Sequence, residues 1–263
     1  MAGQVLMAVH GGIVRVTLSH PGKLNAMSRA MWRELKTVFE SIQQHADLRC
    51  VIVAGEGGNF CAGGDIAEYP AFRFSEADLR EFHEQDVWGG LDAMLRCDVP
   101  VVAQIEGNCM GAGVEIASCC DLRVAGASAR FGAPIARLGF PMAPREARLV
   151  GTALGGLTAR EMLLEAAVLD APTLLLRGFL NAVVADADVA GEVLARAQRV
   201  AALAPQAARL NKQTFRALNQ AFPSAQWSQS AMDSIVAGAY AYADSAEHRE
   251  GIQAFLDKRK PAF

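Results

Sequence analysis

Residues 106–121, which read EGNCMGAGVEIASCCD, constrain the fold of this chain more than any other stretch. They follow the short β-branched run 100–105, which indicates a buried strand, and they carry glycines at positions 107, 111 and 113. Glycine lets the main chain turn tightly, and the first turn of a helix leaves its N–H groups without intrahelical partners. The stretch therefore predicts a strand-to-helix turn that offers backbone donors to an anion or an oxyanion.

Glu115 falls about one turn into this predicted helix, among the apolar residues Val114, Ile116 and Ala117. A carboxylate in apolar surroundings is costly unless it has a partner or a chemical task. The G-x-x-x-G-x-G spacing fits neither a dinucleotide fingerprint nor a P-loop, because no Lys-Ser/Thr follows the last glycine. Taken alone, the stretch leaves two interpretations open: a site built around Glu115, or close helix–strand packing with Glu115 exposed.

The composition narrows the class of protein. The chain has 263 residues, 52% of them hydrophobic and 20% charged, with a net charge of -3, so it offers no basic surface for nucleic acid or acidic lipid. Residues 1–9 lack a basic, apolar leader and no stretch is long enough to span a membrane, which predicts a cytoplasmic protein. The six cysteines form no C-x-x-C pair, so we expect buried free thiols and no metal site.

The hydrophobic pattern predicts an α/β protein with a recurring strand, strand, helix unit. Its first copy is a hairpin over 4–10 and 13–18, a helix over 28–45 and a strand over 50–54. A second pair of strands is expected at 121–125 and 129–131, and one later strand near 182–184. The remaining helices are expected at 145–151, 158–169, 187–203, 206–219 and 225–256.

Two more segments have the composition of loops that serve a site. Residues 55–65 contain five glycines in eleven positions, which favours contacts to the backbone. Residues 66–95 are polar and irregular before they become helical near Leu79, a length more typical of a functional lid than of a connector. The five histidines are scattered, and only His83, in this lid segment, is a candidate for a role.

Together these stretches resemble the crotonase superfamily, the enoyl-CoA hydratase/isomerase family. The resemblance runs the length of the chain. Its signatures are residues 21–27 (PGKLNAM), 60–66 (FCAGGDI), 107–121, 131–134 (FGAP) with 138–139 (LG), 177–184 (RGFLNAVV) and 255–260 (FLDKRK).

The resemblance implies a crotonase-like spiral of ββα repeats, with residues 1–190 as the core and 191–263 as a helical trimerisation region. It implies a homotrimer or a hexamer built as a dimer of trimers. It also implies a coenzyme A thioester as substrate, with no separate cofactor and no metal. We accordingly expect the acyl-CoA and further copies of this chain as partners, and neither nucleic acid nor membrane.

The same resemblance assigns roles to residues. Gly64 and Ala112 match the two backbone N–H groups that hold the thioester oxygen while an enolate forms, and Glu115 matches a catalytic glutamate. Two further groups match positions that contact coenzyme A. Leu24, Ala26 and Ala62 match the wall along its adenine and pantetheine parts, whereas Phe255 and Lys258 match residues that close over it, often from a neighbouring subunit.

The chain departs from the family pattern after Pro134, where hydratases carry a second glutamate and this sequence has Ile135. Isoleucine cannot ionise or donate a proton, so three readings stay open: hydratase-like chemistry with a substitute donor, a one-carboxylate isomerase or decarboxylase, or a non-catalytic acyl-CoA-binding homologue. The candidates for a substitute are Glu68, His83, Glu84 and Glu146. Ionisable side chains are usually exposed, so we expect each of them at the surface.

Overall fold

The structure is a computed structural model that describes residues 2–221 and 236–262. Its larger sheet has the order β1-β2-β3-β4-β6-β9. The antiparallel hairpin of β1 (Gln4–His10) and β2 (Ile13–Ser19) turns at Gly11 and Gly12, both with positive φ, as predicted. The other neighbours pair in parallel: β3 (Cys50–Gly55), β4 (Val101–Ile105), β6 (Leu122–Gly126) and β9 (Ala182–Val184).

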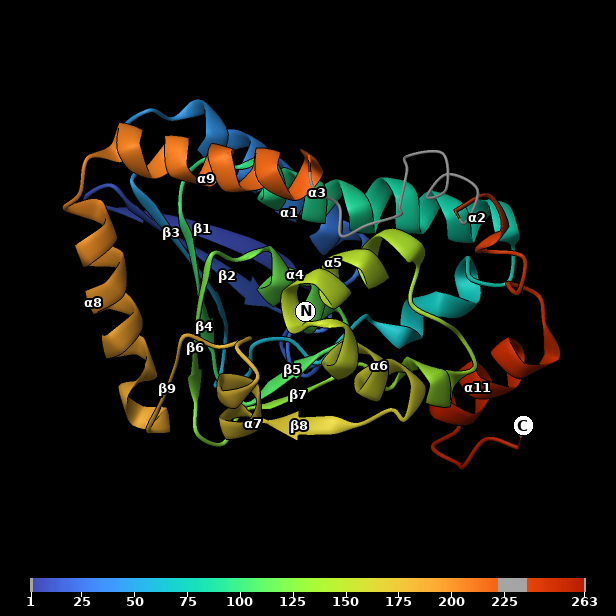
Figure 1. Cartoon of the computed structure of the whole chain (residues 1–263). Coiled ribbons are helices and arrows are strands. Elements are labelled where there is room, and N and C mark those ends of the chain that lie inside the picture. The colour runs from blue at the N-terminus through green and yellow to red at the C-terminus, as the bar shows by residue number, and fades with distance from the viewer. Residues whose placement is uncertain (1, 222–235, 263) are drawn as a thin grey trace.

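A smaller sheet of three strands crosses the direction of β4, β6 and β9 (Figure 1). It consists of β5 (Asn108–Met110), β7 (Arg130–Gly132) and β8 (Val168–Asp170). The sequence analysis missed β5, which is three residues long and lies inside the glycine-rich turn. It also continued a helix through β8, whereas Ala166 adopts a left-handed φ of 53° that ends the helical path.

Helices occupy most of the remaining described chain. In chain order they are α1 (Arg29–Gln44), the 3₁₀ helix η1 (Ile66–Ala71), α2 (Glu76–Glu81), the π-helix η2 (Phe82–Val87), α3 (Trp88–Arg96), α4 (Ala112–Cys119), the 3₁₀ helix η3 (Pro134–Leu138), α5 (Pro144–Leu154), α6 (Gly156–Leu164), α7 (Ala171–Leu176), the 3₁₀ helix η4 (Asp186–Asp188), α8 (Val189–Ala201), α9 (Pro205–Ala221) and α11 (Ala246–Leu256).

Helix α1 shows how the local sequence sets these elements. Ser28 caps it as predicted, its hydroxyl accepting from the Met31 N–H at 3.2 Å. Met31, Leu35 and Phe39 recur at helical spacing and are buried in the main core. The strand, strand, helix unit thus closes over one face of the sheet.

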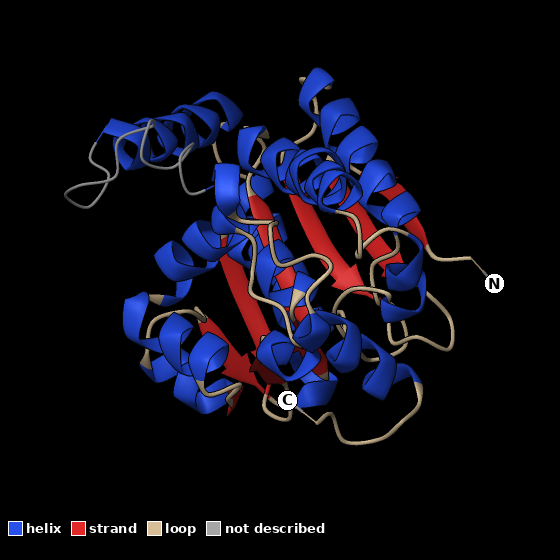
Figure 2. Ribbon diagram, turned by 90° about the vertical axis from the view of Figure 1, so that its right-hand side faces the viewer, coloured by secondary structure: helices blue, strands red, loops and turns tan. Residues whose placement is uncertain are grey.

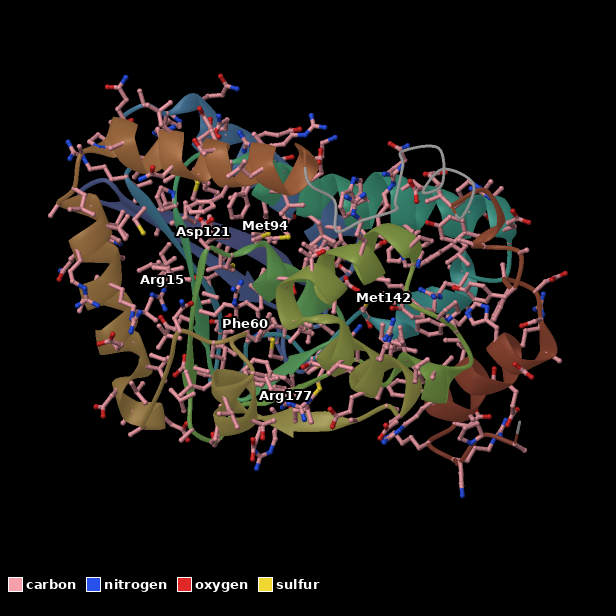
Figure 3. All side chains as sticks on the ribbon, viewed as in Figure 1. Arg15, Phe60, Met94, Asp121, Met142 and Arg177 are labelled. Carbon is pink, nitrogen blue, oxygen red and sulfur yellow. The ribbon has the colours of Figure 1, made fainter. Side chains whose placement is uncertain are left out.

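The larger sheet is covered by helices on both sides (Figure 2). On one side, Val189, Val193 and Ala197 of α8 pack on Ile52 and Val102 of the central strands. On the other side lies the main core, where Phe60 is completely buried and appears near the centre of Figure 3. Because α8 packs on the sheet itself, no gap in packing separates the described residues up to 190 from the helix that follows.

Residues 76–96 form one unbroken helical run whose middle is π-helical over Phe82–Val87. A π turn holds more residues than an α turn, is rare, and is frequent at functional sites. His83 lies in this wide turn. The helix expected from near Leu79 is therefore confirmed, and its π-helical middle was not predicted.

The predicted helix over 225–256 falls partly on residues 222–235, which lie outside the described residues. In the described remainder it is interrupted: residues 239–244 form turns, and α11 begins after Ser245, whose side chain accepts from the His248 N–H. The six cysteines are all buried and free. No helix within residues 2–221 and 236–262 combines the length and the hydropathy needed to cross a bilayer.

Candidate active site

Two glycine-rich turns lie against each other and build one wall of the site. The Cys61 N–H donates to the Asn108 carbonyl at 2.9 Å, and the Met110 N–H donates to the Cys61 carbonyl at 2.8 Å. A Cβ placed on Gly113 would lie 2.6 Å from the Cys61 carbonyl oxygen, so the first turn of α4 needs glycine to approach the other loop. The sequence-predicted Gly64 and Ala112 are thereby brought to one cavity.

Both of these residues present a free backbone donor. Within the described part of the chain, the Gly64 and Ala112 N–H groups donate to no other protein group. The flanking backbone around Gly64 is fixed, because the Met27 N–H donates to the Gly63 carbonyl and the Asp65 N–H donates to the Met27 carbonyl. Two donors held on a rigid backbone at one cavity are the arrangement that an oxyanion requires.

The cavity has a volume of about 530 Å³ and a mostly apolar lining. Trp32, Ile66, Phe82, Phe140 and Met142 contribute much of that lining, and Met142 marks the position of the cavity in Figure 3. A volume of this size can hold a small organic group. Polar side chains that face it are therefore few and informative.

Glu115 lies on α4, half-buried, and lines this cavity. Burial raises the pKa of its carboxyl group, repulsion from Glu146 raises it further, and Arg73 opposes both. The open interpretation left by the sequence, a surface Glu115, is thus wrong. A carboxyl group with a raised pKa can carry and release a proton near neutral pH.

His83 and Glu146 form a buried pair, although the sequence analysis expected both at the surface. Glu146, on the first turn of α5, is 1% exposed, and its Oε1 lies 3.0 Å from His83 Nδ1. Burial and the nearby Glu84 raise the pKa of Glu146, while burial and Arg73 lower the pKa of His83 well below its usual value. His83 lines the cavity, and its Nε2 is buried with no partner among the described residues.

The other two candidates for a substitute donor are engaged elsewhere. Glu68 accepts a hydrogen bond from the Arg29 N–H at 2.9 Å. Glu84 pairs with Arg145 at 2.8 Å and accepts from the Tyr240 hydroxyl at 2.7 Å. Neither lines the cavity. Of the four candidates, only His83 lines the cavity, and Glu146 is linked to the cavity through its hydrogen bond with His83.

Ile135 lies on η3 and lines the cavity, half-buried. Its side chain packs against the main core. The cavity lining is therefore apolar at the position where a second glutamate was expected.

Two cavity residues from η1 and the segment after it were missed by the sequence analysis. Tyr69 is buried, and burial raises the pKa of its hydroxyl to about 12. A Cβ on Gly64 would lie 2.1 Å from the Tyr69 hydroxyl oxygen, so the tyrosine requires glycine at 64. Arg73 is 1% exposed and also lines the cavity. An arginine in the aromatic run 69–74 was the signal that could have marked this region.

The residues matched to coenzyme A contacts fall in different places. Ala26 and Ala62 line the cavity, whereas Leu24 is exposed, with a left-handed φ of 47°, and its carbonyl accepts from the Ala62 N–H at 3.0 Å. Phe255 of α11 lines the cavity of its own chain. Lys258, just beyond α11, does not line it.

Two more basic residues line the cavity and were not among the sequence candidates. Lys23 is partly exposed and pairs with Asp65 at 2.5 Å. Arg137 is exposed and donates to the Ala166 carbonyl at 3.0 Å. Since both are more exposed than the residues around Glu115, they lie toward the mouth of the cavity. In the described residues no group of three or more His, Cys, Asp or Glu is suited to hold a metal ion.

A family model and two similar proteins all indicate the same family. A family model described as enoyl-CoA hydratase/isomerase matches residues 8–263. The chain is 30% identical over 259 residues to human mitochondrial enoyl-CoA hydratase domain-containing protein 3, covering 96% of this chain and 80% of that protein. It is 29% identical over 249 residues to the probable enoyl-CoA hydratase echA8 of Mycobacterium tuberculosis, covering 94% and 93%.

Solved structures agree with that match. An enoyl-CoA hydratase/carnithine racemase from Magnetospirillum magneticum has a TM-score of 0.80 at 34% identity, covering 98% of this chain and 94% of that one. A methylmalonyl-CoA decarboxylase in complex with 2-nitronate-propionyl-CoA has a TM-score of 0.87 at 24% identity, covering 99% and 98%, which shows a shared fold alone.

Proposed function

Because this chain belongs to the enoyl-CoA hydratase/isomerase family, we propose that it processes an acyl-CoA thioester through an enolate, with hydratase-like chemistry as the leading reaction. The observation that carries the proposal is the shared cavity of Glu115 and the two free N–H groups of Gly64 and Ala112. The cavity brings together a carboxyl group that can carry a proton and two N–H groups that can stabilise a developing negative charge.

The proposed role of the two N–H groups is to bind the thioester oxygen. Negative charge grows on this oxygen as the α-carbon loses a proton or as water adds to the β-carbon, so donors fixed in advance stabilise the transition state more than the substrate. Loss of one such donor costs about 3 to 4 kcal/mol in known enzymes. Ala112 supplies the same N–H that a glycine would.

Glu115 is proposed as the principal acid and base at the α-carbon. Its apolar surroundings and raised pKa favour the protonated carboxyl group, which can give its proton to an enolate and take it back. In hydration, the hydroxyl of water goes to the β-carbon and this proton to the α-carbon.

The His83–Glu146 pair is proposed as the substitute for the absent glutamate. With the hydrogen on Nδ1, His83 donates to Glu146 and Nε2 presents a lone pair that can take a proton from water. With Glu146 protonated and donating to Nδ1, Nε2 carries a hydrogen and can donate it. The unpartnered Nε2 on a cavity residue is what supports this role.

A second candidate function keeps Glu115 as the sole proton carrier. Ile135 makes the facing wall apolar, which favours isomerisation or decarboxylation, reactions that need an enolate but no activated water. A non-catalytic acyl-CoA-binding homologue is the third reading. We rank hydratase-like chemistry first because the other two readings leave His83 Nε2 without a role. A buried polar atom without a hydrogen-bond partner costs stability.

The binding of coenzyme A along Ala26 and Ala62, with closure by Phe255, follows the family pattern and fits the cavity lining. The phosphates would find Lys23 and Arg137 toward the mouth, since each can meet a phosphate oxygen with a charge-assisted bond. Leu24 and Lys258 are proposed to contact the more exposed end of coenzyme A. A cytoplasmic location and the absence of a cofactor stay predictions, and we propose fatty acid metabolism as the setting.

We also propose a homotrimer or hexamer. Leu157, Leu164 and Leu176 are largely exposed, and so are Leu210 and Phe215 on α9. Apolar side chains so exposed mark surfaces that associate. Sedimentation at micromolar concentration should give a trimer or a hexamer, and a monomer would contradict the assembly.

Deuterium exchange tests the activity. Incubating the protein with several acyl-CoAs in deuterated water should place deuterium at the thioester α-carbon, read by mass spectrometry, and Glu115→Gln should abolish it. Glu68→Gln, outside the cavity, is the matched control and should exchange like the wild type. Saturable calorimetric binding without exchange would support the non-catalytic reading, and no binding of any acyl-CoA would overturn the proposal.

A further inference from the structure

Arg73 is a buried cation without a carboxylate beside it. It is 1% exposed, and among the described residues no Asp or Glu oxygen lies within ion-pairing distance of its guanidinium. Burying an unpaired charge is costly, and native proteins rarely keep one without a use. The charge therefore needs an explanation beyond packing.

The groups that surround Arg73 hold it in place without neutralising it. Its guanidinium carbon lies 4.3 Å from the centre of the Tyr69 ring and 3.9 Å from that of Phe140. Its Nε donates to His248 Nε2 and its Nη2 donates to the Tyr242 hydroxyl, each at the long distance of 3.4 Å. These contacts orient the fork, but all four partners are neutral, and burial keeps His248 so by lowering its pKa to about 4.

Arg123 shows how this fold satisfies an arginine that serves structure alone. Its nitrogens donate to the carbonyl oxygens of Phe179 and Cys120, both at 2.6 Å, and of Ala117 at 3.2 Å. Carbonyl oxygens carry partial negative charge and take up the donors at short range. Arg73 has no carbonyl partner among the described residues, and its Nη1 makes no hydrogen bond there.

Arg73 also lines the cavity that holds Glu115 and the two free N–H groups. The two carboxyl groups that influence it, Glu115 and Glu146, have raised pKa values because of burial, which favours their uncharged forms. The inner part of the cavity thus has a buried positive charge that no ionised carboxylate of the described residues contacts. An anion entering with the substrate would supply the missing partner.

We infer that the acyl group carries a carboxylate of its own, so that the substrate is the coenzyme A half-thioester of a dicarboxylic acid, with Arg73 binding the free carboxylate. This inference rests on the proposed function, since the thioester oxygen must lie at Gly64 and Ala112 for the acyl chain to extend into the cavity. A guanidinium binds a carboxylate through two parallel charge-assisted bonds, which a hydrocarbon chain cannot replace. The charge on the acyl chain, more than its length, sets specificity.

Binding of matched acyl-CoAs tests the inference on the intact protein. By calorimetry, succinyl-CoA and glutaryl-CoA should bind at least about tenfold more tightly than butyryl-CoA and pentanoyl-CoA, which share the thioester but lack the charge. Arg73→Gln should remove this preference, lowering the affinity for succinyl-CoA at least about tenfold more than the affinity for butyryl-CoA. Arg73→Lys, which keeps the charge, should retain part of it.

Arg80→Gln is the matched control, because Arg80 also lies over a ring, 5.0 Å from the centre of Tyr240, but does not line the cavity. It should bind all four ligands like the wild type. Equal or tighter binding of the uncharged acyl-CoAs by the wild type would overturn this inference and leave the proposed function standing. Failure of all four to bind would overturn both.

Discussion

The two walls of the cavity are built in different ways. One, which we call the backbone wall, comprises residues 62–64 and 111–115 and acts mainly through main-chain N–H groups held by hydrogen bonds between two turns. The other, the side-chain wall, comprises Tyr69, Arg73, His83 and Ile135, with Glu146 behind His83. Main-chain N–H groups change little when residues are substituted. Substitutions of side chains can change the reaction and the substrate while the fold stays the same.

This difference teaches where generality and specificity lie in the molecule. Stabilising an oxyanion is needed by every reaction that passes through a thioester enolate, and this is the role we propose for the backbone wall. We propose that the choice of acyl group and the delivery of a second proton depend on the side-chain wall. Variants of the first should lower every activity alike, and variants of the second should separate one activity or ligand from another.

The largest effect is expected for Glu115→Gln, the one side chain on the backbone wall that moves a proton. Glutamine keeps the shape but cannot take up a proton, so turnover should fall at least about a hundredfold with little change in acyl-CoA affinity. Steady-state kinetics and calorimetry measure the two quantities. Retained turnover would move the chemistry to the side-chain wall.

Gly64→Ala should affect both walls, because the added Cβ on the backbone wall would lie 2.1 Å from the hydroxyl oxygen of Tyr69 on the side-chain wall. The loop must shift, so we expect turnover to fall by up to about a hundredfold, as for loss of an oxyanion donor. Adding Tyr69→Phe removes the clashing oxygen and should recover part of the rate. If the double variant is no faster than Gly64→Ala, the tyrosine does not set the position of the Gly64 N–H.

His83→Asn should separate two activities. Asparagine cannot act as the base, so hydration should fall by about tenfold to a hundredfold, whereas α-carbon exchange through Glu115 should change much less. Parallel assays of the two activities measure this, with His10→Asn on the exposed strand β1 as the control. An equal fall in both activities would show that His83 supports the wall and does not carry the proton.

Ile135→Glu adds the carboxylate that hydratases of this family have at this position. Because the wild type lacks it, we expect slow hydration of crotonyl-CoA by the wild type and a gain of about tenfold in the variant. The gain should be larger when His83→Asn is also present. A wild type with rates normal for enzymes, about 1 to 10³ s⁻¹, together with no gain, would show that Ile135 is not the limit.

The smallest effect concerns stability. The folded-state pKa values of Glu115 and Glu146 are raised, so above the ordinary carboxyl pKa of 4.5 the native state holds more protons than the unfolded chain. The free energy of unfolding must then fall as pH rises toward those raised values, with a slope of about 1.4 kcal/mol per pH unit for each such carboxyl group. Glu146→Gln should flatten this slope.

Urea denaturation between pH 7 and 8 is the measurement. The lowered pKa of His83 acts in the opposite direction, because it lowers the free energy of unfolding as pH falls below 6.5. Between pH 7 and 8 this histidine is neutral in the folded protein and mostly neutral in the unfolded chain. Denaturation at higher pH would add the buried thiols, whose pKa values are raised. An unchanged slope in Glu146→Gln would mean that Glu146 is already ionised in the folded protein.

The sequence predicted the backbone wall and little of the side-chain wall, for a physical reason. Strand β4 and the glycines that follow it are set by local patterning, and the free N–H groups follow from the turn itself. His83 and Glu146 meet across 63 positions of sequence, and their contact depends on how η2 and α5 pack. Periodicity does not report such a contact, and the usual exposure of ionisable side chains wrongly predicted both residues at the surface.

The wide turn at Phe82–Val87 makes this chain sensitive to length at one place. Each residue of an α-helix turns the direction of the next by about 100°. A π turn takes up one residue more than an α turn, so deleting one residue from it would let residues 76–96 close as a regular helix while the segments on either side keep their orientation. Only side chains inside the turn, His83 among them, would then point in a new direction, so the extra residue of this turn sets which side chain lines the cavity while every glycine of the frame is kept.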